Sequence, residues 1–468
     1  MEYISTRGDT APMTFTEAVM TGQAPDGGLL VPSSIPDVSD DLDRLATLGY
    51  TELAGEILGL FADDVPADDL KALIERSYAT FDSPEITPLV PLGTVQLLEL
   101  FHGPTLAFKD VALQFLGNMF EYILERSGGS LNILGATSGD TGSAGIYGVR
   151  GKARVRIFVM YPDGRTSAVQ ERQMTTVLDE NVHCLAIQGS FDDCQGLMKS
   201  VFNDLEFKRS HHLGAINSIN CARLLAQVVY YFYGYFRAAK TVGDPVSFSV
   251  PTGNFGDIFA GYLALKMGLP VHKLILATNE NDILRRFFEQ GIYRRGQVHE
   301  TLSPSMDIQV ASNFERYLHY RLREDSGALV RFMAAFAETG EARLSDFVDD
   351  AAALPVSETF VAHTTPRAET LAAIERYHRT QGYVLDPHTA VGVAAGESWQ
   401  AAHPGEGPVV CLATAHPAKF TDAIEEAIGQ KAHHPLVDAL DGAKSRTHRL
   451  PADVALVQSY IRSVCGEA

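Results

Sequence analysis

The chain has 468 residues and a formal net charge of −20, with 46% hydrophobic and 21% charged residues. This length and balance predict a globular protein of roughly two or three domains with sizeable cores. The acidic charge argues against nucleic acids and anionic membranes as partners, because both require a basic protein surface. No apolar run reaches the roughly 18 residues that a bilayer span requires.

The N-terminus and the cysteines indicate a cytoplasmic protein. The opening residues, from Met1 to Ser5, lack the charged-then-apolar plan of a signal peptide. The five cysteines are scattered, which is typical of reduced thiols. The histidine pairs at 211–212 and 433–434 have no third ligand nearby, so we expect them to be exposed and predict no metal site.

Taken in chain order, residues 1–90 are rich in helix signals and form a separate N-terminal piece. Beyond them, β-like runs alternate with amphipathic helical ones. Strands are predicted over residues 131–134, 155–161, 184–187, 246–250, 274–277 and 409–413, with a helix over about 167–178. Ser190 and Asp193 form an N-cap pattern for the next helix. The polar, Ala-rich stretch around 335–370 is predicted to form surface helices and loops.

This alternation predicts an α/β protein whose mostly parallel sheets carry helices on both faces. We divide the chain into an N-terminal domain (1–90), two α/β domains (91–240 and 241–430) that can interleave, and a C-terminal tail (431–468).

One lysine, Lys109, stands out because it follows a Gly-Pro bend and lies between aromatic and apolar neighbours. Desolvation disfavours an ammonium and leaves a neutral nucleophile, as a Schiff base to a carbonyl cofactor such as pyridoxal phosphate requires. A lone lysine is more often a solvated surface charge. The assignment of Lys109 therefore depends on the motifs that follow it.

A Gly- and hydroxyl-rich turn at residues 136–145 follows the first of the predicted strands. It contains Thr137, Ser138, Asp140 and Thr141. Glycines let a ligand approach the backbone, and hydroxyls with free helix-start N–H groups can hold a carboxylate. A tight turn with a capped helix is the alternative. The glycine spacing differs from that of a dinucleotide-binding fingerprint.

A second turn follows the strand at 246–250 and consists of Gly253, Asn254, Phe255, Gly256 and Asp257. Successive backbone N–H groups at a helix start suit a phosphate. The turn lacks the Gly-Lys-Ser/Thr of a nucleotide P-loop, so a small phosphate monoester fits better than a triphosphate. An ordinary Gly-rich turn is the alternative.

Two further positions could bind ligand. Thr414 ends the strand at 409–413, where α/β proteins bind ligands, although a helix-capping threonine would look the same. Asn217 and Ser218 precede a helix on which Arg223 lies, and together they could hold a second phosphate. The alternative for this cluster is a polar helix face with an N-cap.

In their order along the chain, these motifs resemble fold type II pyridoxal-phosphate enzymes, and more closely the threonine synthase family. The resemblance is carried by residues 102–110, 138–144, 217–223, 302–308, 385–390 and 414–420, with 15–19 and 24–29 near the N-terminus. It covers nearly the whole chain. No family motif is found beyond about Lys431.

The resemblance implies a role for each motif. Lys109 would carry pyridoxal 5'-phosphate and shuttle protons, the Gly253 to Asp257 turn would hold the cofactor phosphate, and Thr414 would bind the pyridine nitrogen. The family turn often ends in Asn, so the carboxylate of Asp257 is expected to point away from the phosphate. Thr137, Ser138, Asp140 and Thr141 would surround the substrate carboxylate, with Asp140 facing away from it or toward the cofactor hydroxyl. Asn217, Ser218 and Arg223 would bind the substrate phosphate.

The implied reaction is conversion of O-phospho-L-homoserine and water to L-threonine and phosphate by a monomer or homodimer. A phospholyase acting on the same substrate would release a 2-keto acid instead. Other fold type II enzymes, such as dehydratases and sulfhydrylases, need no second phosphate site. A non-catalytic relative that only binds the cofactor is the remaining alternative.

Overall fold

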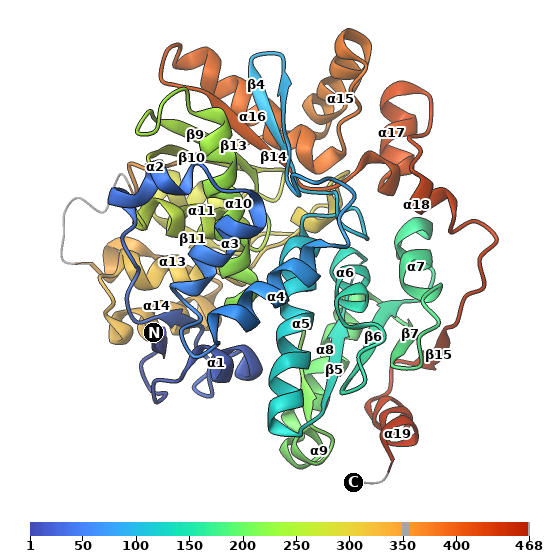
Figure 1. Cartoon of the computed structure of the whole chain (residues 1–468). Coiled ribbons are helices and arrows are strands. Elements are labelled where there is room, and N and C mark those ends of the chain that lie inside the picture. Colours follow the sequence, from blue (N-terminus) through green and yellow to red (C-terminus); the bar gives the residue numbers. More distant parts are fainter. Residues whose placement is uncertain (138, 349–355, 467–468) are drawn as a thin grey trace.

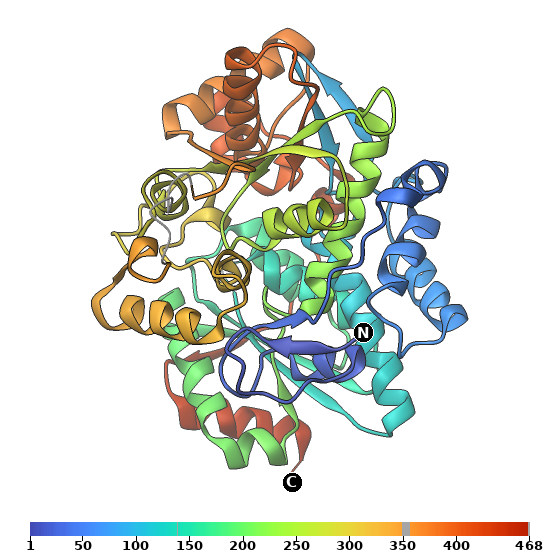
Figure 2. The same ribbon diagram turned by 90° about the vertical axis from the view of Figure 1, so that its left-hand side faces the viewer.

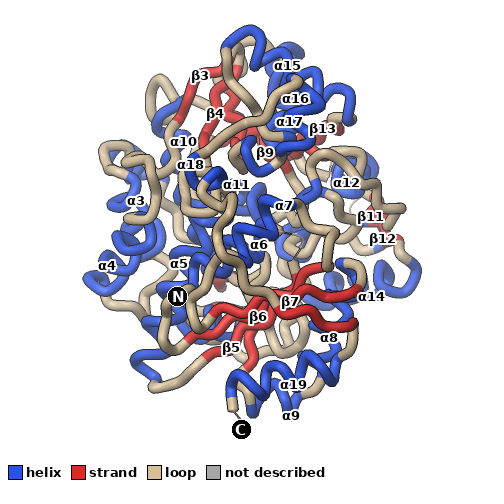
Figure 3. The backbone as a smooth tube through the Cα atoms, turned by 90° about the vertical axis from the view of Figure 1, so that its right-hand side faces the viewer, coloured by secondary structure: helices blue, strands red, loops and turns tan. Residues whose placement is uncertain are grey.

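The computed structural model describes residues 1–137, 139–348 and 356–466 of the chain. It contains two open sheets that lie in separate lobes (Figure 1, Figure 3). The larger is six-stranded in the order β13-β10-β9-β14-β4-β3. Its strands are β3 (Leu89–Leu92), β4 (Val95–Glu99), β9 (Val246–Pro251), β10 (Val271–Thr278), β13 (Phe360–Thr364) and β14 (Val409–Ala413). All neighbours are parallel except the edge pair β3 and β4.

The second sheet is five-stranded, parallel throughout and ordered β15-β7-β6-β5-β8. Its strands are β5 (Leu131–Ala136), β6 (Val155–Pro162), β7 (Val182–Gln188), β8 (Leu213–Gly214) and β15 (His448–Pro451). The predicted strands and the α/β class are confirmed. The capping box of Ser190 and Asp193 is also present, at the start of α8 (Phe191–Asn203).

Helices cover both faces of the larger sheet, because alternate strand residues enter different cores. In β10, Leu274 and Leu276 face one core, which includes α10 (Cys221–Ala238) and α11 (Gly256–Lys266). Ile275 and Ala277 face the other, which includes α15 (Arg367–Gln381) and α16 (Pro387–Ala402). Strands buried on both faces are typical of parallel sheets.

The two sheets exchange segments across the predicted domain boundaries. Strand β4 precedes the second sheet in the chain but pairs with β14 in the first. Strand β15 and α19 (Val454–Cys465) belong to the predicted tail, yet they complete the second sheet and its outer core. A parallel neighbour is reached only by a crossover connection, which lets the chain leave a sheet and return. The division into four parts remains a prediction.

The stretch around 335–370 is not all surface helix and loop, and that part of the prediction is wrong. After α14 (Ser326–Thr339) and β12 (Glu341–Arg343), it supplies β13, an edge strand of the larger sheet. An edge strand is buried on fewer sides, so β13 lacks the continuous apolar run that marks the central strands. Only Phe360 of its residues is buried.

The N-terminal segment packs against the helices of both lobes (Figure 2). It consists of the antiparallel pair β1 (Tyr3–Ser5) and β2 (Leu30–Pro32), with α1 (Phe15–Thr21), α3 (Tyr50–Gly59) and α4 (Ala67–Tyr78) as its main helices. Helix α3 contacts α10, and α4 contacts α5 (Lys109–Ser127). In the described part of the chain, none of the helices has the length and apolar character of a membrane span.

Helices α5 and α6 (Asp140–Val149) cross backbone to backbone. A Cβ on Gly117 would lie 1.9 Å from the carbonyl oxygen of Gly148, and one on Gly148 would lie 2.4 Å from that of Leu113. Only glycine permits this approach. Because α5 begins at Lys109 and α6 at Asp140, the crossing sets how far apart these two side chains lie.

We therefore expect Gly117→Ala to destabilise the protein by about 1–3 kcal/mol, because the added methyl group pushes the two helices apart. Gly55→Ala in α3 is the control, since a Cβ there meets no described atom within 4 Å. Alanine favours a helix interior, so the control should be neutral or stabilising. Thermal unfolding followed by circular dichroism measures both, and equal melting temperatures for the two variants would contradict the tight crossing.

Candidate active site

The predicted ligand-binding turns meet at one cavity between the lobes. Strands β9 and β14 are parallel neighbours, so the turns that follow them lie at the same edge of the sheet. The cavity is lined by the start of α5, the start of α6, the start of α10 and these two turns. The predicted site residues in its lining are Lys109, Asp140, Thr141, Ser218, Arg223, Gly253, Asn254, Phe255, Gly256, Asp257 and Thr414.

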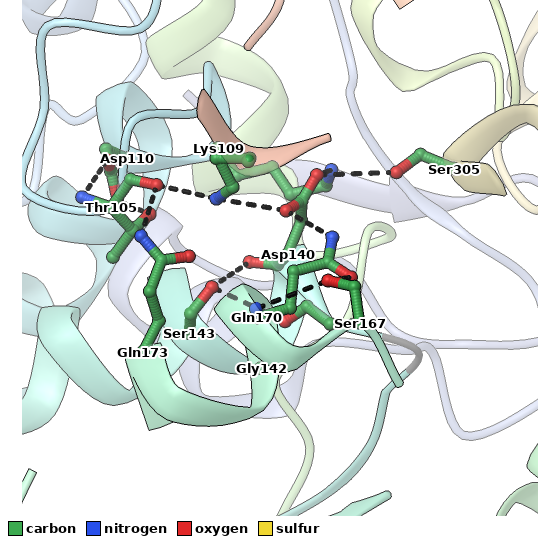
Figure 4. Close-up of polar contacts among 12 residues, drawn as sticks. Thr105, Lys109, Asp110, Asp140, Gly142, Ser143, Ser167, Gln170, Gln173 and Ser305 are labelled. Carbon is green, nitrogen blue, oxygen red and sulfur yellow. Dashed lines mark hydrogen bonds and ion pairs between the residues drawn. The ribbon is translucent and has the colours of Figure 1, made fainter. Parts of the chain in front are cut away.

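Lys109 is the first residue of α5, and only 11% of its side chain is exposed. Its Nζ lies 3.5 Å from Oδ2 of Asp140 (Figure 4) and 4.9 Å from the ring centre of Phe108. Burial lowers the pKa of the Lys109 amine below its usual value, and the nearby charges of Lys419 and Arg223 act in the same direction, although Asp140 opposes them. The structure thus provides the desolvated lysine that the sequence predicts.

The turn after β9 forms a cup at the start of α11. Phe255 has a φ of 65°, in the left-handed region, and α11 begins at the next residue without a side-chain cap in the described chain. A Cβ on Gly253 would lie 2.6 Å from the carbonyl oxygen of Ser305, so only glycine fits there. The uncapped N–H groups at the start of α11 can bind an anion in the cavity.

Asp257 turns one carboxyl oxygen toward two buried tyrosines of α10. Oδ1 accepts hydrogen bonds from the hydroxyls of Tyr230, at 2.5 Å, and Tyr231, at 3.0 Å. Oδ2 has no hydrogen-bond partner among the described residues. Burial raises the pKa of the Asp257 carboxyl to about 6, against the effect of the two hydroxyls. This carboxyl group is therefore easily protonated.

Among the described residues, the carboxylate of Asp140 has three hydrogen-bonding or ionic neighbours besides Lys109. Its Oδ1 lies 3.0 Å from Nζ of Lys419 and accepts a hydrogen bond from Nε2 of Gln170 at 2.8 Å, while Ser305 Oγ donates to Oδ2 at 3.5 Å (Figure 4 shows the last two). Burial alone favours the neutral acid, but the charges of Lys419 and Lys109 hold the pKa of the Asp140 carboxyl well below its usual range. Asp140 is thus a buried carboxylate that faces amines.

Two other predicted substrate residues lie behind the cavity rather than in its lining. The hydroxyl of Thr137 accepts hydrogen bonds from the N–H groups of Gly139 and Gly142, both at 2.9 Å, and so holds the turn before α6. Asn217 uses its Oδ1 to accept from Ile219 N–H at 3.2 Å. Ser138 lies outside the described residues. The side chains of Thr137 and Asn217 therefore stabilise turns, and residues next to these turns line the cavity.

Arg223 is 4% exposed, and its guanidinium opens on the cavity. Its Nη1 donates to the carbonyl oxygen of Asn217 at 2.7 Å, whereas Nε is buried and lacks a partner in the described part of the chain. No carboxylate of the described residues forms an ion pair with it. Desolvation lowers the pKa of Arg223 to about 10, which leaves it protonated at neutral pH. A buried cation without a counter-ion indicates an anion-binding site.

Ser218, the other lining residue of this cluster, exchanges a hydrogen bond with Ser312 at 2.7 Å. The N-cap of α10 is Asn220, whose side chain accepts from Ala222 N–H. Asn220 and Gln227, which share the polar helix face with Arg223, are buried as well. The polar face of α10 is therefore an interior surface and not a solvated one.

Thr414 is held by the start of α16. Its N–H donates to the hydroxyl of Thr389 at 3.2 Å, and Thr389 in turn hydrogen-bonds the carboxylate of Asp386. Asp386 also contacts Nδ1 of His388 at 3.0 Å, whose Nε2 accepts from Ser305 N–H at 3.2 Å. This network ties the turn after β14 to the residues 303–306 on the opposite wall.

Sequence reasoning assigned no role to three residues of the cavity lining, Ser305, His388 and Gln227, or to Lys419 and Gln170, which contact Asp140. Ser305, His388 and Lys419 lie in the segments 302–308, 385–390 and 414–420, which carry the family resemblance, and this was the signal that could have found them. The expectation that His211 is exposed is wrong. It is 7% exposed and stacks on Phe207 at a ring distance of 4.1 Å. No group of three or more His, Cys, Asp or Glu side chains suited to a metal occurs among the described residues.

The cavity fits pyridoxal phosphate in three respects. It holds one buried amine whose pKa is lowered, an uncapped helix start that can take a phosphate, and a hydroxyl at the end of β14. Residues 81–341 match the family model described as pyridoxal-phosphate dependent enzyme. The fold and site thus define a pyridoxal-phosphate-dependent enzyme.

The flanking segments match two more family models, threonine synthase N terminus over residues 2–78 and threonine synthase, C-terminal over residues 389–461. The chain is 47% identical to threonine synthase of Schizosaccharomyces pombe, covering 92% of this chain and 89% of that protein. It is 45% identical to threonine synthase of Pseudomonas aeruginosa, covering 98% of each. The crystal structure of pyridoxal-phosphate-bound threonine synthase from Brucella melitensis superposes with a TM-score of 0.94 at 43% identity, covering both chains completely. The chain belongs to the threonine synthase family.

The environment of Asp257 leads to a prediction about stability. An acid whose pKa is raised on folding binds more protons in the native than in the unfolded state, so stability falls as pH rises from about 4 to 6. Asn can accept from both tyrosines and carries no charge. We expect Asp257→Asn to stabilise the cofactor-free protein at pH 8 by up to about 3 kcal/mol, and by roughly half as much at pH 5.

Melting temperatures of the parent and Asp257→Asn at the two pH values measure this effect. Asp192→Asn is the control, because Asp192 is exposed at the start of α8. An Asp257→Asn stabilisation that is the same at pH 5 and pH 8 would show that Asp257 does not titrate in this range.

Proposed function

We propose that this protein converts O-phospho-L-homoserine and water to L-threonine and phosphate, using pyridoxal phosphate on Lys109. One observation favours O-phospho-L-homoserine over substrates that carry no phosphate. Arg223 is a buried guanidinium on α10 that opens on the same cavity as Lys109, whereas the proposed cofactor-phosphate cup lies at the start of α11. A substrate that carries its own phosphate supplies the anion that this cation lacks.

The proposed roles follow from the geometry of the cavity. The cup from Gly253 to Asp257 binds the cofactor phosphate through backbone N–H groups. Thr414 donates to or accepts from the pyridine nitrogen. Thr141 and the start of α6 bind the substrate carboxylate. Arg223 and Ser218 bind the substrate phosphate, and Asn217 holds the guanidinium of Arg223 in place through its carbonyl group.

When bound, pyridoxal phosphate supplies an electron-withdrawing ring that stabilises negative charge developing on the substrate. Nζ of Lys109 is the proton carrier. It takes a proton from the α-carbon and then from the β-carbon of the substrate, and it returns one at the γ-carbon after phosphate has left. Arg223 stabilises the charge that accumulates on the leaving phosphate. The second proton that Lys109 removes leaves with the phosphate as hydrogen phosphate. Water then adds its hydroxyl group to the β-carbon and its proton to the α-carbon, which gives threonine.

The proposal includes the location, the oligomeric state and the partners of the enzyme. The enzyme acts in the cytoplasm as a monomer or homodimer, and neither nucleic acid nor a membrane is a partner. A phospholyase would share the first proton transfers and release a 2-keto acid. Analysis of the products formed from O-phospho-L-homoserine distinguishes the two, and a keto acid as the main product would overturn the synthase.

Lys109→Ala should abolish turnover because it removes the amine that is proposed to bind the cofactor and to carry the protons. The other amine beside Asp140, that of Lys419, is held by the carbonyl oxygen of Thr105. The variant should keep the parent's circular dichroism spectrum, since an alanine at the start of α5 suits a helix. Threonine formation is measured against Lys444→Met, an exposed lysine. Turnover by the Lys109→Ala variant above the rate without enzyme would exclude the role given to Lys109.

Arg223→Ala should raise KM for O-phospho-L-homoserine by about ten- to a hundred-fold, because a hydrogen bond to a charged group contributes about 1.5–3 kcal/mol. Its cofactor content, read from the visible spectrum, should match that of the parent. Arg209→Ala, at an exposed position, is the control for the loss of an arginine. Release of the cofactor from the Arg223→Ala variant would mean that the two phosphate sites are exchanged in this proposal.

A further inference from the structure

A second lysine lies beside the proposed catalytic one and is even more buried. Lys419 ends the 3₁₀ helix η4 (Pro417–Lys419) after β14, and its side chain is 0% exposed. Its Nζ donates to the carbonyl oxygen of Thr105 at 2.6 Å and lies 3.0 Å from Oδ1 of Asp140. The function described above gives this amine no task, although burying an ammonium is costly unless it is paired.

Lys419 and Lys109 share the single carboxylate of Asp140 through different oxygens. Lys419 approaches Oδ1 at 3.0 Å, and Lys109 approaches Oδ2 at 3.5 Å. A carboxylate next to an amine favours the ammonium form and so opposes its use as a base. A second cation closer to the same carboxylate reduces this effect, because it offsets most of the negative charge that Lys109 experiences.

Other charged groups face this pair from every element around it. Arg223 of α10 and His388 of α16 lie on the cavity side. Asp110, beside Lys109 on α5, accepts hydrogen bonds from the N–H and hydroxyl of Thr105, both at 2.7 Å.

Asp257 of α11 is engaged by the tyrosines of α10. Burial raises the pKa of both Asp110 and Asp257 to about 6, but of these three carboxyl groups only that of Asp140 forms an ion pair with Lys109. The balance at Lys109 is thus set mainly by Asp140 and by the cations that contact it.

We propose that Lys419 is a positioning residue that neutralises Asp140 and thereby lowers the proton affinity of the Lys109 nitrogen. With Lys419 in place, this nitrogen loses its proton at lower pH, both as a free amine and when it carries the cofactor. The proposal rests on the proposed function in one respect, namely that pyridoxal phosphate is bound to Lys109. It does not depend on which substrate or product the enzyme has.

The test is a pH titration of the visible absorbance of the holoenzyme without substrate, since protonation of the nitrogen that joins Lys109 to the cofactor changes the colour. Lys419→Met should raise the midpoint by about one pH unit or more, the size expected when a buried carboxylate loses its second cation. Lys419→Arg keeps the charge and should stay near the parent. The exposed control Lys444→Met should not move the midpoint. An unchanged or lowered midpoint in Lys419→Met overturns the proposal.

A second pair of variants covers the case in which Lys419→Met fails to fold because Asp140 is left with too little positive charge around it. Asp140→Asn alone should lower the midpoint, since Lys419 then acts on Lys109 without compensation. Asp140→Asn combined with Lys419→Met removes both charges and is expected to fold, as neutral replacements of buried ion pairs often do. Its midpoint should lie above that of Asp140→Asn. If the two midpoints are equal, Lys419 has no influence on Lys109 and the proposal fails, whatever the enzyme forms from O-phospho-L-homoserine.

Discussion

The cavity depends on positive charge held in the interior of a strongly acidic protein. Lys109, Lys419 and Arg223 are all buried around it, and only Asp140 among the described residues forms ion pairs with any of them. Two amines therefore share one carboxylate, while the guanidinium stands apart without a counter-ion. An unpaired cation in the interior costs free energy until an anion binds beside it, and the proposed cofactor and substrate each bring a phosphate. The net charge of −20 on the whole chain makes this local excess of cations the main attraction for such ligands.

The backbone supports this arrangement by close packing. The crossing of α5 and α6 at Gly117 and Gly148 places Lys109 and Asp140, the first residues of the two helices, against each other. The parallel pairing of β9 with β14 brings the phosphate cup and Thr414 to the same edge. Two lobes built on different sheets thus contribute opposite walls of one site. Because close-packed helices cannot shift gradually, small changes at the crossing should reach the lysine directly.

Those parts of the site could be predicted from the sequence whose residues lie next to one another in the chain. The cup from Gly253 to Asp257 is a continuous turn, and Lys109 lies within an unusual apolar setting. The α/β class followed from alternating strands and helices for the same local reason. Lys419 could not be assigned in this way, because its partner Asp140 is distant in sequence and the pair exists only once β14 and α6 are folded together. The edge strand β13 was missed because the strand that it pairs with, β10, is distant in sequence. His211 is different, because it stacks on Phe207 only four residues earlier, and the prediction of an exposed histidine overlooked this local contact.

Thr137 has a structural role that the sequence did not reveal. Its residue type and place suggested a substrate contact, yet its hydroxyl accepts the N–H groups of Gly139 and Gly142 and stabilises the turn. A hydroxyl that accepts two hydrogen bonds still has its proton to donate, so the substrate contact of Thr137 remains a prediction. Asp257, the second residue of α11, is likewise bound by protein groups, since its Oδ1 accepts hydrogen bonds from two tyrosines of α10, while its buried Oδ2 has no partner among the described residues. Burial raises the pKa of this carboxyl group to about 6, so it loses its charge at a higher pH than an ordinary aspartate does. Protonation would therefore reduce the repulsion between this acid and a phosphate bound at the start of α11.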